Sequence, residues 1–191
     1  MGKNRLEAFS DGVIAIIITI MVLELKVPHG DQLSELAATV PVMLGYVLSF
    51  IYVGIYWNNH HHLFHVARHV NGAVLWGNLH LLFWLSIIPF VTSWMGQHYA
   101  SAWPVAAYGI VLMMSGAAYY LLTQALISLH GRDSAIARAL GNDFKGKASV
   151  AIYLIAIGLA FVQTWLSLLL YTGVALLWIV PDRRMERVLK D

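Results

Sequence analysis

The chain has 191 residues, of which 59% are hydrophobic and 12% are charged, and its mean hydropathy is +0.68. A soluble domain carries about a quarter charged residues, so a soluble enzyme, a nucleic-acid-binding domain and a disordered chain are poor interpretations. The chain contains no cysteine, which excludes disulfides, thiolate metal sites and cysteine nucleophiles. We therefore expect an all-α protein that crosses a membrane several times.

Six apolar segments are predicted to span the bilayer, because a helical span needs about 20 apolar residues. The apolar stretch 148–180 would reach about 50 Å as one helix, which is longer than the hydrocarbon region is thick. We predict two short spans there, with a break near Gln163, Thr164 and Trp165. The predicted spans of this single domain, residues 1–191, are 9–25, 36–64, 73–94, 104–129, 148–162 and 165–180.

Lys and Arg residues are distributed unevenly between the two sides of this predicted bundle. With the N-terminus inside, the outer segments contain only Lys26, and eleven basic residues lie inside. This asymmetry predicts that both termini are cytoplasmic, which requires an even number of spans. No small-residue cleavage site follows the basic N-terminal flank, so we expect the first span to be retained. The inner residues are Lys3, Arg5, Arg68, Arg132, Arg138, Lys145, Lys147, Arg183, Arg184, Arg187 and Lys190.

The predicted spans contain few polar side chains that could carry out transport chemistry. Spans four to six offer only Gln124 and Gln163 as strongly polar residues. A proton-coupled transporter normally has a carboxylate at mid-depth, and a substrate carrier has a polar cage at broken helices. Neither feature is evident, and the Thr-Val-Gly-Tyr-Gly filter of ordinary potassium channels is also missing.

One polar cluster, Arg5, Ser10 and Asp11, lies at the inner end of the first span. On a helix Arg5 and Asp11 point about 240° apart, so they do not pair well with each other. Asp11 needs a partner on another helix if it is to be satisfied away from water. We expect a structural clamp rather than a proton relay, because no further titratable group continues the path. The candidate partners are His60, His61 and Asn78.

A second polar cluster is a run of histidines on the second span. His61, His65 and His69 are spaced i, i+4 and i+8, which places three imidazoles on one helix face. This spacing could bind zinc or help to hold a haem. We favour the simpler interpretation, in which these histidines lie in the headgroup region and bond to lipids and neighbouring helices, because no carboxylate motif accompanies them.

One face of the first span contains mostly apolar residues in register with Arg5. On the helical wheel these residues all fall within about 60° of the Arg5 direction. In a spanning helix, an Ile/Leu stripe indicates packing more often than a pore. Periodicity cannot decide between the two here, because every face of this helix is apolar. The stripe consists of Phe9, Gly12, Ile16, Thr19, Ile20 and Leu23.

The first span nevertheless has a distinctive motif, Arg5-x-x-x-Phe9-Ser10-Asp11 followed by the apolar run 16–25. This segment resembles the first-helix signature of the transmembrane protein 175 family, the potassium channels of endosomes and lysosomes with six-span bacterial relatives. The resemblance continues in Trp57-Asn58-Asn59-His60-His61, in Asn78 with Pro89-Phe90, and in Pro181-Asp182-Arg183-Arg184. It covers essentially the whole chain.

The resemblance implies a homotetramer in a bacterial plasma membrane whose first helices line a central pore without a carbonyl filter. It implies a passive, potassium-permeable cation channel that is no enzyme, needs no cofactor and binds no nucleic acid. Its partners would be potassium ions, the lipid bilayer and copies of itself. By motif position, Ile16, Ile20 and Leu23 would form the constriction, with Thr19 as a polar lining residue. The implied structural motif consists of Arg5, Phe9, Ser10, Asp11, His60, His61 and Asn78.

A path without charged groups is typical of a channel with a hydrophobic constriction, which blocks ions by dewetting when it is narrow. Ile16 to Leu23 covers about 10 Å along a helix axis, a suitable length for two or three rings of side chains. Two alternatives remain. One is a secondary or proton-coupled transporter that uses His60, His61 or Asp11. The other is a haem-binding or metal-binding membrane protein that uses the histidine face.

Overall fold

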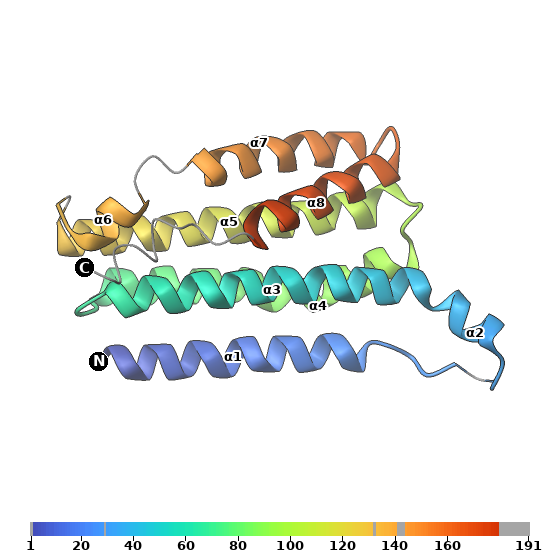
Figure 1. Ribbon diagram of the computed structural model, residues 1–191, viewed down its shortest axis with the longest axis horizontal. Coiled ribbons are helices and arrows are strands. Elements are labelled where there is room, and N and C mark those ends of the chain that lie inside the picture. Colours follow the sequence, from blue (N-terminus) through green and yellow to red (C-terminus); the bar gives the residue numbers. More distant parts are fainter. Residues whose placement is uncertain (1, 29, 132, 141–143, 180–191) are drawn as a thin grey trace.

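The structure is a computed structural model that describes residues 2–28, 30–131, 133–140 and 144–179. Over these ranges the chain forms eight helices joined by turns and short connections (Figure 1). The helices are α1 (Lys3–Leu23), α2 (Leu33–Ala38), α3 (Val40–Val66), α4 (Gly72–Gln97), α5 (Ala102–His130), α6 (Ala135–Leu140), α7 (Phe144–Leu159) and α8 (Thr164–Ile179).

Four of the described helices, α1, α3, α4 and α5, are long and apolar enough to cross a membrane. They contain between 21 and 29 residues each. Helix α8 is a shorter apolar helix of 16 residues, and α7 has the same length. The protein is therefore an all-helical membrane protein with four clear spans and a pair of shorter helices.

The helix boundaries differ from the predicted spans at several points. Helix α1 begins six residues before the predicted start of the first span. Residues 36–38 belong to the separate helix α2, and α3 begins at Val40 with Pro41 in its first turn. Proline fits that position because the first-turn N–H groups have no partner within the helix. The break in the last apolar stretch falls at residues 160–163. The predicted end at 180 lies outside the described residues.

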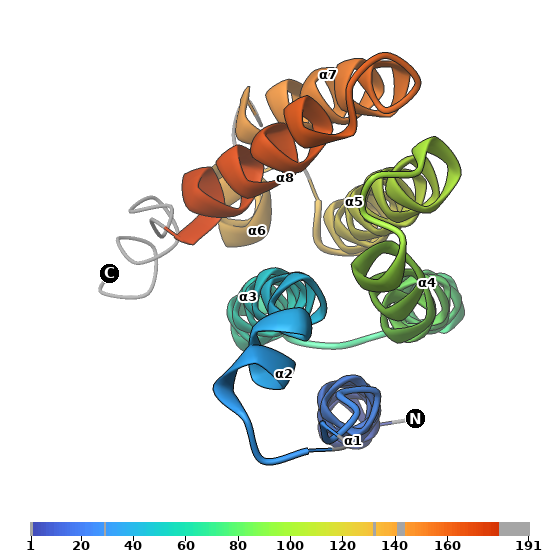
Figure 2. The ribbon, with the colours of Figure 1, turned by 90° about the vertical axis from the view of Figure 1, so that its right-hand side faces the viewer.

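Helix α1 lies at the edge of the bundle, beside α3 and α4 (Figure 2). Helix α5 packs against α4 on one side and against the α7–α8 pair on the other. The core between these helices contains fully buried leucines such as Leu81 and Leu85 on α4 and Leu112 and Leu122 on α5. The single chain therefore covers α4 and α5 well and covers α1 on one side only.

The two ends of the bundle contain different connections and different kinds of side-chain contact. The start of α1, the α3–α4 connection and α6 lie at one end, and α2 and the α7–α8 turn lie at the other (Figure 1). At the first end Lys3 Nζ donates to the Ala67 carbonyl at 3.0 Å, and at the other end the rings of Trp103 and Phe161 lie 5.1 Å apart. Lys26 follows α1 at this second end.

The basic residues predicted to lie inside are grouped as expected where the structure describes them. They belong to the start of α1, the α3–α4 connection, α6 and the first turn of α7, all at or toward one end. We call this end the basic end. The described members are Lys3, Arg5, Arg68, Arg138, Lys145 and Lys147. The remaining five, Arg132, Arg183, Arg184, Arg187 and Lys190, lie outside the described residues, as does the motif 181–184.

Buried hydroxyl groups join the helices within the apolar core. Ser49 Oγ lies 2.7 Å from Thr92 Oγ1 and 2.9 Å from the Tyr108 hydroxyl, and these contacts connect α3, α4 and α5. The Tyr171 hydroxyl donates to the Val105 carbonyl on α5 at 3.2 Å. A Cβ atom at Gly109 would collide with the Tyr171 hydroxyl, so glycine at this position makes room on α5 for the Tyr171 ring.

Candidate functional site

Helix α1 has one buried and one exposed face. The buried side chains are at most 2% exposed and pack toward α3 and α4: Leu6, Ser10, Ile14, Ile17 and Met21. On the helical wheel the centre of this face lies about 130° from the centre of the predicted pore stripe. The stripe is exposed along its whole length in the single chain, and so is Arg5, which lies in register with it: Phe9, Gly12, Ile16, Thr19, Ile20 and Leu23.

The exposed face of α1 changes in chemistry along its length. Its first turn carries Arg5, whereas Ile16 is 58% exposed and Leu23 is 80% exposed farther along. Thr19 Oγ1 bonds to the Ile16 carbonyl at 2.8 Å, so its hydroxyl hydrogen is satisfied within the helix. An ionised or polar group is costly against lipid hydrocarbon. This face is therefore charged at the basic end and almost entirely apolar toward the other end.

The buried face of α1 is fixed by a polar network centred on Asn78 of α4. Asn78 Nδ2 donates to Ser10 Oγ on α1 at 2.9 Å, and Asn78 Oδ1 lies 2.8 Å from His60 Nε2 on α3. All three side chains are at most 2% exposed. Ser10 Oγ in turn bonds to the Leu6 carbonyl at 2.8 Å.

The geometry of this network fixes the direction of each hydrogen bond. An amide oxygen can only accept, so the Asn78 oxygen requires a proton on Nε2 of His60. The His60 ring also packs on Phe64, with ring centroids 4.6 Å apart. Because each residue of the triad comes from a different helix, Ser10, His60 and Asn78 hold α1, α3 and α4 together at the basic end.

Asp11 has a different partner from the three candidates considered in the sequence. Its Oδ1 accepts a hydrogen bond from Trp57 Nε1 on α3 at 3.0 Å. Both side chains are exposed in the single chain. The prediction that Asp11 bonds to another helix is correct, but naming His60, His61 or Asn78 as that partner was wrong. Trp57 precedes His60 by three residues, so both lie on the same turn of α3. This turn contacts α1 twice: Trp57 bonds directly to Asp11, and His60 is linked to Ser10 through Asn78.

The other residues of the predicted structural motif lie outside this network. Arg5 is exposed, and its side chain has no hydrogen bond to any residue in the described ranges. Phe9 is 53% exposed on the same side of α1. His61 is exposed and stacks between Trp57 and His65, with ring centroids 6.1 Å from each. The structure thus brings together Ser10, Asp11, His60 and Asn78 with their partners but leaves these three at the surface of the single chain.

The histidine face does not form a metal site within the part of the chain that the structure describes. No group of three or more His, Cys, Asp or Glu side chains there is arranged to hold a metal ion. His69 instead packs against His130 of α5, with ring centroids 4.7 Å apart. His130 Nε2 accepts from the Arg68 backbone N–H at 3.1 Å and so ties the α3–α4 connection to the end of α5.

The opposite end of α1 has a polar contact that the sequence analysis missed. The Ser93 hydroxyl on α4 donates to Glu24 Oε2 at 2.9 Å, and Gln97 Nε2 donates to Ser93 Oγ at 3.0 Å. These residues line a cavity of about 530 Å³ together with Ile20. The available signal was the position of Glu24 directly after the predicted pore stripe. Nothing in the sequence pairs it with a residue 69 positions away.

Comparison with known proteins shows what this arrangement resembles. The family model described as endosomal/lysosomal potassium channel TMEM175, where TMEM175 is transmembrane protein 175, matches residues 5–89. A potassium channel of Chryseobacterium sp. (strain P1-3) is 51% identical over 191 residues, which is 100% of both chains. The human endosomal/lysosomal proton channel TMEM175 is 38% identical over 96 residues, covering 44% of this chain and 19% of the human protein.

A solved structure agrees with these sequence relationships. The crystal structure of a lysosomal potassium-selective channel TMEM175 homolog from Chamaesiphon minutus superposes with a TM-score of 0.81 at 27% sequence identity. The match covers 94% of this chain and 97% of that chain. Full-length identity to a bacterial potassium channel and near-complete structural overlap lead to the same conclusion: the chain belongs to the TMEM175 family of ion channels.

Proposed function

We propose that this protein is a passive, potassium-permeable cation channel that assembles as a homotetramer around its α1 helices. One observation carries the proposal: every residue of the α1 stripe is exposed in the single chain, although the opposite face of α1 is fully buried. Four copies arranged with this stripe inward would cover it and enclose a central path. Phe9 and Arg5 would then contact neighbouring subunits or the pore entrance.

The proposed gate is a hydrophobic constriction rather than a carbonyl filter. Ile16, Ile20 and Leu23 would each contribute a ring of four aliphatic side chains over about 10 Å of the axis. An ion in such a ring loses water without gaining protein oxygens, so the closed state excludes ions by dewetting. Thr19 would supply the hydroxyl oxygens nearest to this constriction. Widening the rings would hydrate the path and permit conduction.

The proposed channel has six spans in one domain, residues 1–191, with α7 and α8 as the fifth and sixth. Their 16 residues each correspond to about 24 Å of helix, which is short for a span, but they pack on α3 and α5 as a pair. Six of the seven described Lys and Arg residues, all except Lys26, lie at or toward one end, which supports cytoplasmic termini by the positive-inside rule. Bacterial relatives named potassium channels support placing the protein in a bacterial plasma membrane.

Proton permeation is a second candidate function, favoured by one observation. Vertebrate relatives from human, chicken, cattle and rat are named endosomal/lysosomal proton channels, and they match 34–44% of this chain. A hydrated apolar constriction could pass protons along the same path as potassium. Measuring potassium flux and proton flux through the same protein in liposomes tests this second function.

The decisive experiment compares two neighbouring isoleucines of α1 in a liposome flux assay with potassium, sodium and proton gradients. Ile16→Asn places an amide on the exposed stripe, whereas Ile17→Asn places it on the buried face, where the native side chain is 2% exposed. We expect Ile16→Asn to raise basal cation flux and to lower the preference for potassium over sodium, because water then occupies the constriction. Ile17→Asn should instead lower the yield of folded protein.

The control for this comparison is the amount of folded oligomer, measured by size-exclusion chromatography before reconstitution. Wild-type flux that follows a chemical gradient without saturation supports a channel, and saturable flux coupled to protons would indicate a transporter instead. If correctly assembled Ile16→Asn protein conducts like the wild type, Ile16 does not line the path and the proposed gate is wrong.

A further inference from the structure

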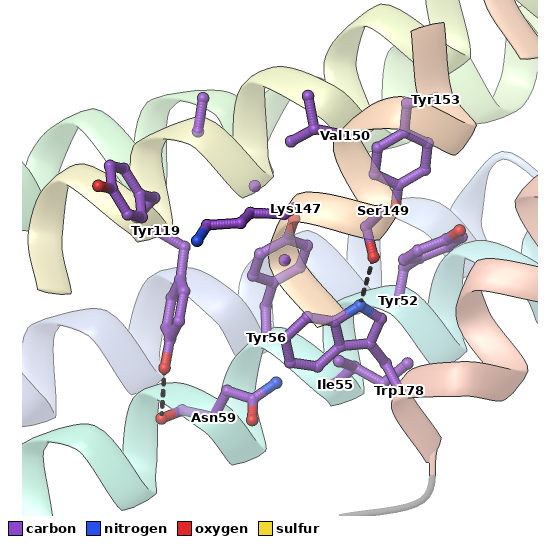
Figure 3. Close-up of a pocket in the computed structure, with 14 residues that line it drawn as sticks. Tyr52, Ile55, Tyr56, Asn59, Tyr119, Lys147, Ser149, Val150, Tyr153 and Trp178 are labelled. Atoms are coloured by element: carbon purple, nitrogen blue, oxygen red, sulfur yellow. Dashed lines mark hydrogen bonds between the residues drawn. The ribbon is translucent and has the colours of Figure 1, made fainter. Parts of the chain in front are cut away.

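A separate cavity of about 440 Å³ lies between α3, α5, α7 and α8, away from the exposed stripe of α1. Tyr52, Tyr56 and Tyr153 form part of its wall, and Trp178 lies beside them (Figure 3). Gly116 on α5 leaves part of this space open, because it has no side chain. A Cβ atom there would lie 3.6 Å from the Tyr56 hydroxyl. Its volume falls within the range of about 300–1,000 Å³ that is typical of small-molecule sites.

The cavity extends from the basic end of the bundle into the apolar depth of the helices. Lys147, in the first turn of α7, marks its basic end, and Tyr153 lies six residues or about 9 Å farther along the same helix. Trp178 lies in the last turn of α8 and donates through Nε1 to Ser149 Oγ at 2.8 Å. Indole rings of this kind are enriched at the membrane–water interface. In the proposed orientation, the Lys147 end of the cavity, which we call its mouth, lies nearer the headgroups, and the Tyr153 end lies nearer the acyl chains.

Among the described residues that line the cavity, Lys147 is the one that carries a charge. Figure 3 shows the Lys147 side chain extending across the cavity toward Tyr119. Lys145 lies close by, with its Nζ 5.9 Å from the centre of the Trp178 ring and 3.4 Å from the Leu177 carbonyl. Basic pockets between spanning helices on the cytoplasmic side are suited to anionic lipid headgroups. An apolar cavity of this depth would otherwise stay empty or hold poorly bonded water, which is unfavourable in either case.

We propose that this cavity binds one acyl chain of an anionic phospholipid from the leaflet at the basic end, with the lipid phosphate at Lys147. The aromatic wall contacts the hydrocarbon, and the two lysines select the negative headgroup. The site uses no residue of the α1 stripe or of the Asn78 network. Its test is a binding measurement, so its outcome is independent of whether the protein conducts ions.

The experiment is native mass spectrometry of the full-length protein purified with an equimolar mixture of phosphatidylglycerol and phosphatidylcholine of identical acyl chains. We expect one phosphatidylglycerol per chain to be retained in preference to phosphatidylcholine. Lys147→Gln should lower this preference about fivefold, as expected for one basic group near an anionic surface. Ala117→Leu, which fills the cavity from α5, should lower retention of both lipids. Gly158→Leu, on an exposed part of α7 with open space around it, should bind like the wild type.

Each outcome decides the proposal. Preferential retention that both cavity variants reduce supports it. Equal retention of the two lipids, or retention that Ala117→Leu and Lys147→Gln leave unchanged, would overturn it, as would retention of free fatty acid alone. If Ala117→Leu does not assemble by size-exclusion chromatography, Lys147→Gln decides the question, because it leaves the aromatic wall and the volume of the cavity unchanged.

Discussion

The basic end of the bundle and the far half of α1 are held in place by different means. At the basic end, α1 is joined to its neighbours by directed hydrogen bonds through Ser10, Asp11 and Lys3. From Ile16 to Leu23 its neighbours contact only the apolar buried face, and the other face is exposed. Three hydrogen bonds fix the basic end of the helix, whereas the proposed gate is held by packing and by one exposed hydrogen bond, from Ser93 to Glu24, just beyond Leu23. A shift of the far half would therefore break the one bond at Glu24, whereas a shift of the basic end would break all three of the bonds there.

The largest expected effect is an all-or-none difference in cysteine labelling between the two ends of the bundle, which shows which side of the membrane each end faces. The chain lacks cysteine, so single cysteines can be introduced without background. We expect Asp31→Cys and Gln97→Cys to react with an impermeant thiol reagent added outside intact cells, and Asp133→Cys to react only after lysis. Labelling of Asp133→Cys from outside would contradict the proposed orientation.

The second prediction removes the centre of the basic-end network. Asn78→Leu leaves the buried His60 N–H without an acceptor, and such a loss costs about 1–3 kcal/mol in soluble proteins. Hydrogen bonds between spanning helices are often weaker, near 0.6 kcal/mol, so we expect the lower half of that range. The measurement is thermal unfolding of the purified oligomer. Asn4→Leu, on an exposed part of α1, is the control, and equal stability of the two variants would show that the network does not hold the helices together.

How far the sequence predicts this site depends on whether a feature is local. Helical periodicity places Ile16, Ile20 and Leu23 on one face of α1, but every face of this helix is apolar, so only the family resemblance singled out these residues, and only the packed structure shows that their face is exposed. The partner of Asp11 does not follow, because several polar side chains were predicted at the same end and only three-dimensional packing selects Trp57. The cavity beside Lys147 was not foreseen either, since four helices create it and no single segment encodes it. Helix α2 was missed because its apolar residues continue into α3.

A smaller effect is expected where the basic-end contact is exposed. Asp11→Ala removes the acceptor of the Trp57 indole N–H, and we expect a loss of about 0.5–1.5 kcal/mol because water can replace the bond. Asp11→Asn keeps an acceptor oxygen at the same place and should retain most of the stability. Chemical denaturation of the two variants and of Trp57→Phe measures the coupling. Additive effects of Asp11→Ala and Trp57→Phe would show that the two side chains do not interact in the assembled protein.

The smallest effect should be local to the α3–α4 connection. His130→Phe keeps a ring against His69 but removes the acceptor for the Arg68 N–H. Losing one bond of about 1 kcal/mol should speed amide hydrogen exchange there about fivefold, without a change in overall unfolding. Hydrogen-exchange mass spectrometry of the peptide containing Arg68 measures this. His98→Phe, at the opposite end of the bundle, should leave that peptide unchanged, and protection that survives His130→Phe would show that the bond is dispensable.

The central claim, that the exposed stripe of α1 lines the ion path, is tested most directly by single cysteines in neighbouring positions. Potassium flux is measured in liposomes before and after a cationic thiol reagent is added to Ile20→Cys, Leu23→Cys and Met21→Cys proteins. Ile20 and Leu23 are 44% and 80% exposed in the single chain, whereas Met21 is 2% exposed. We predict that the reagent abolishes flux through the Ile20→Cys and Leu23→Cys proteins and leaves the Met21→Cys protein unaffected. Modified but fully conducting Ile20→Cys and Leu23→Cys proteins would place the stripe against lipid and contradict the proposed pore.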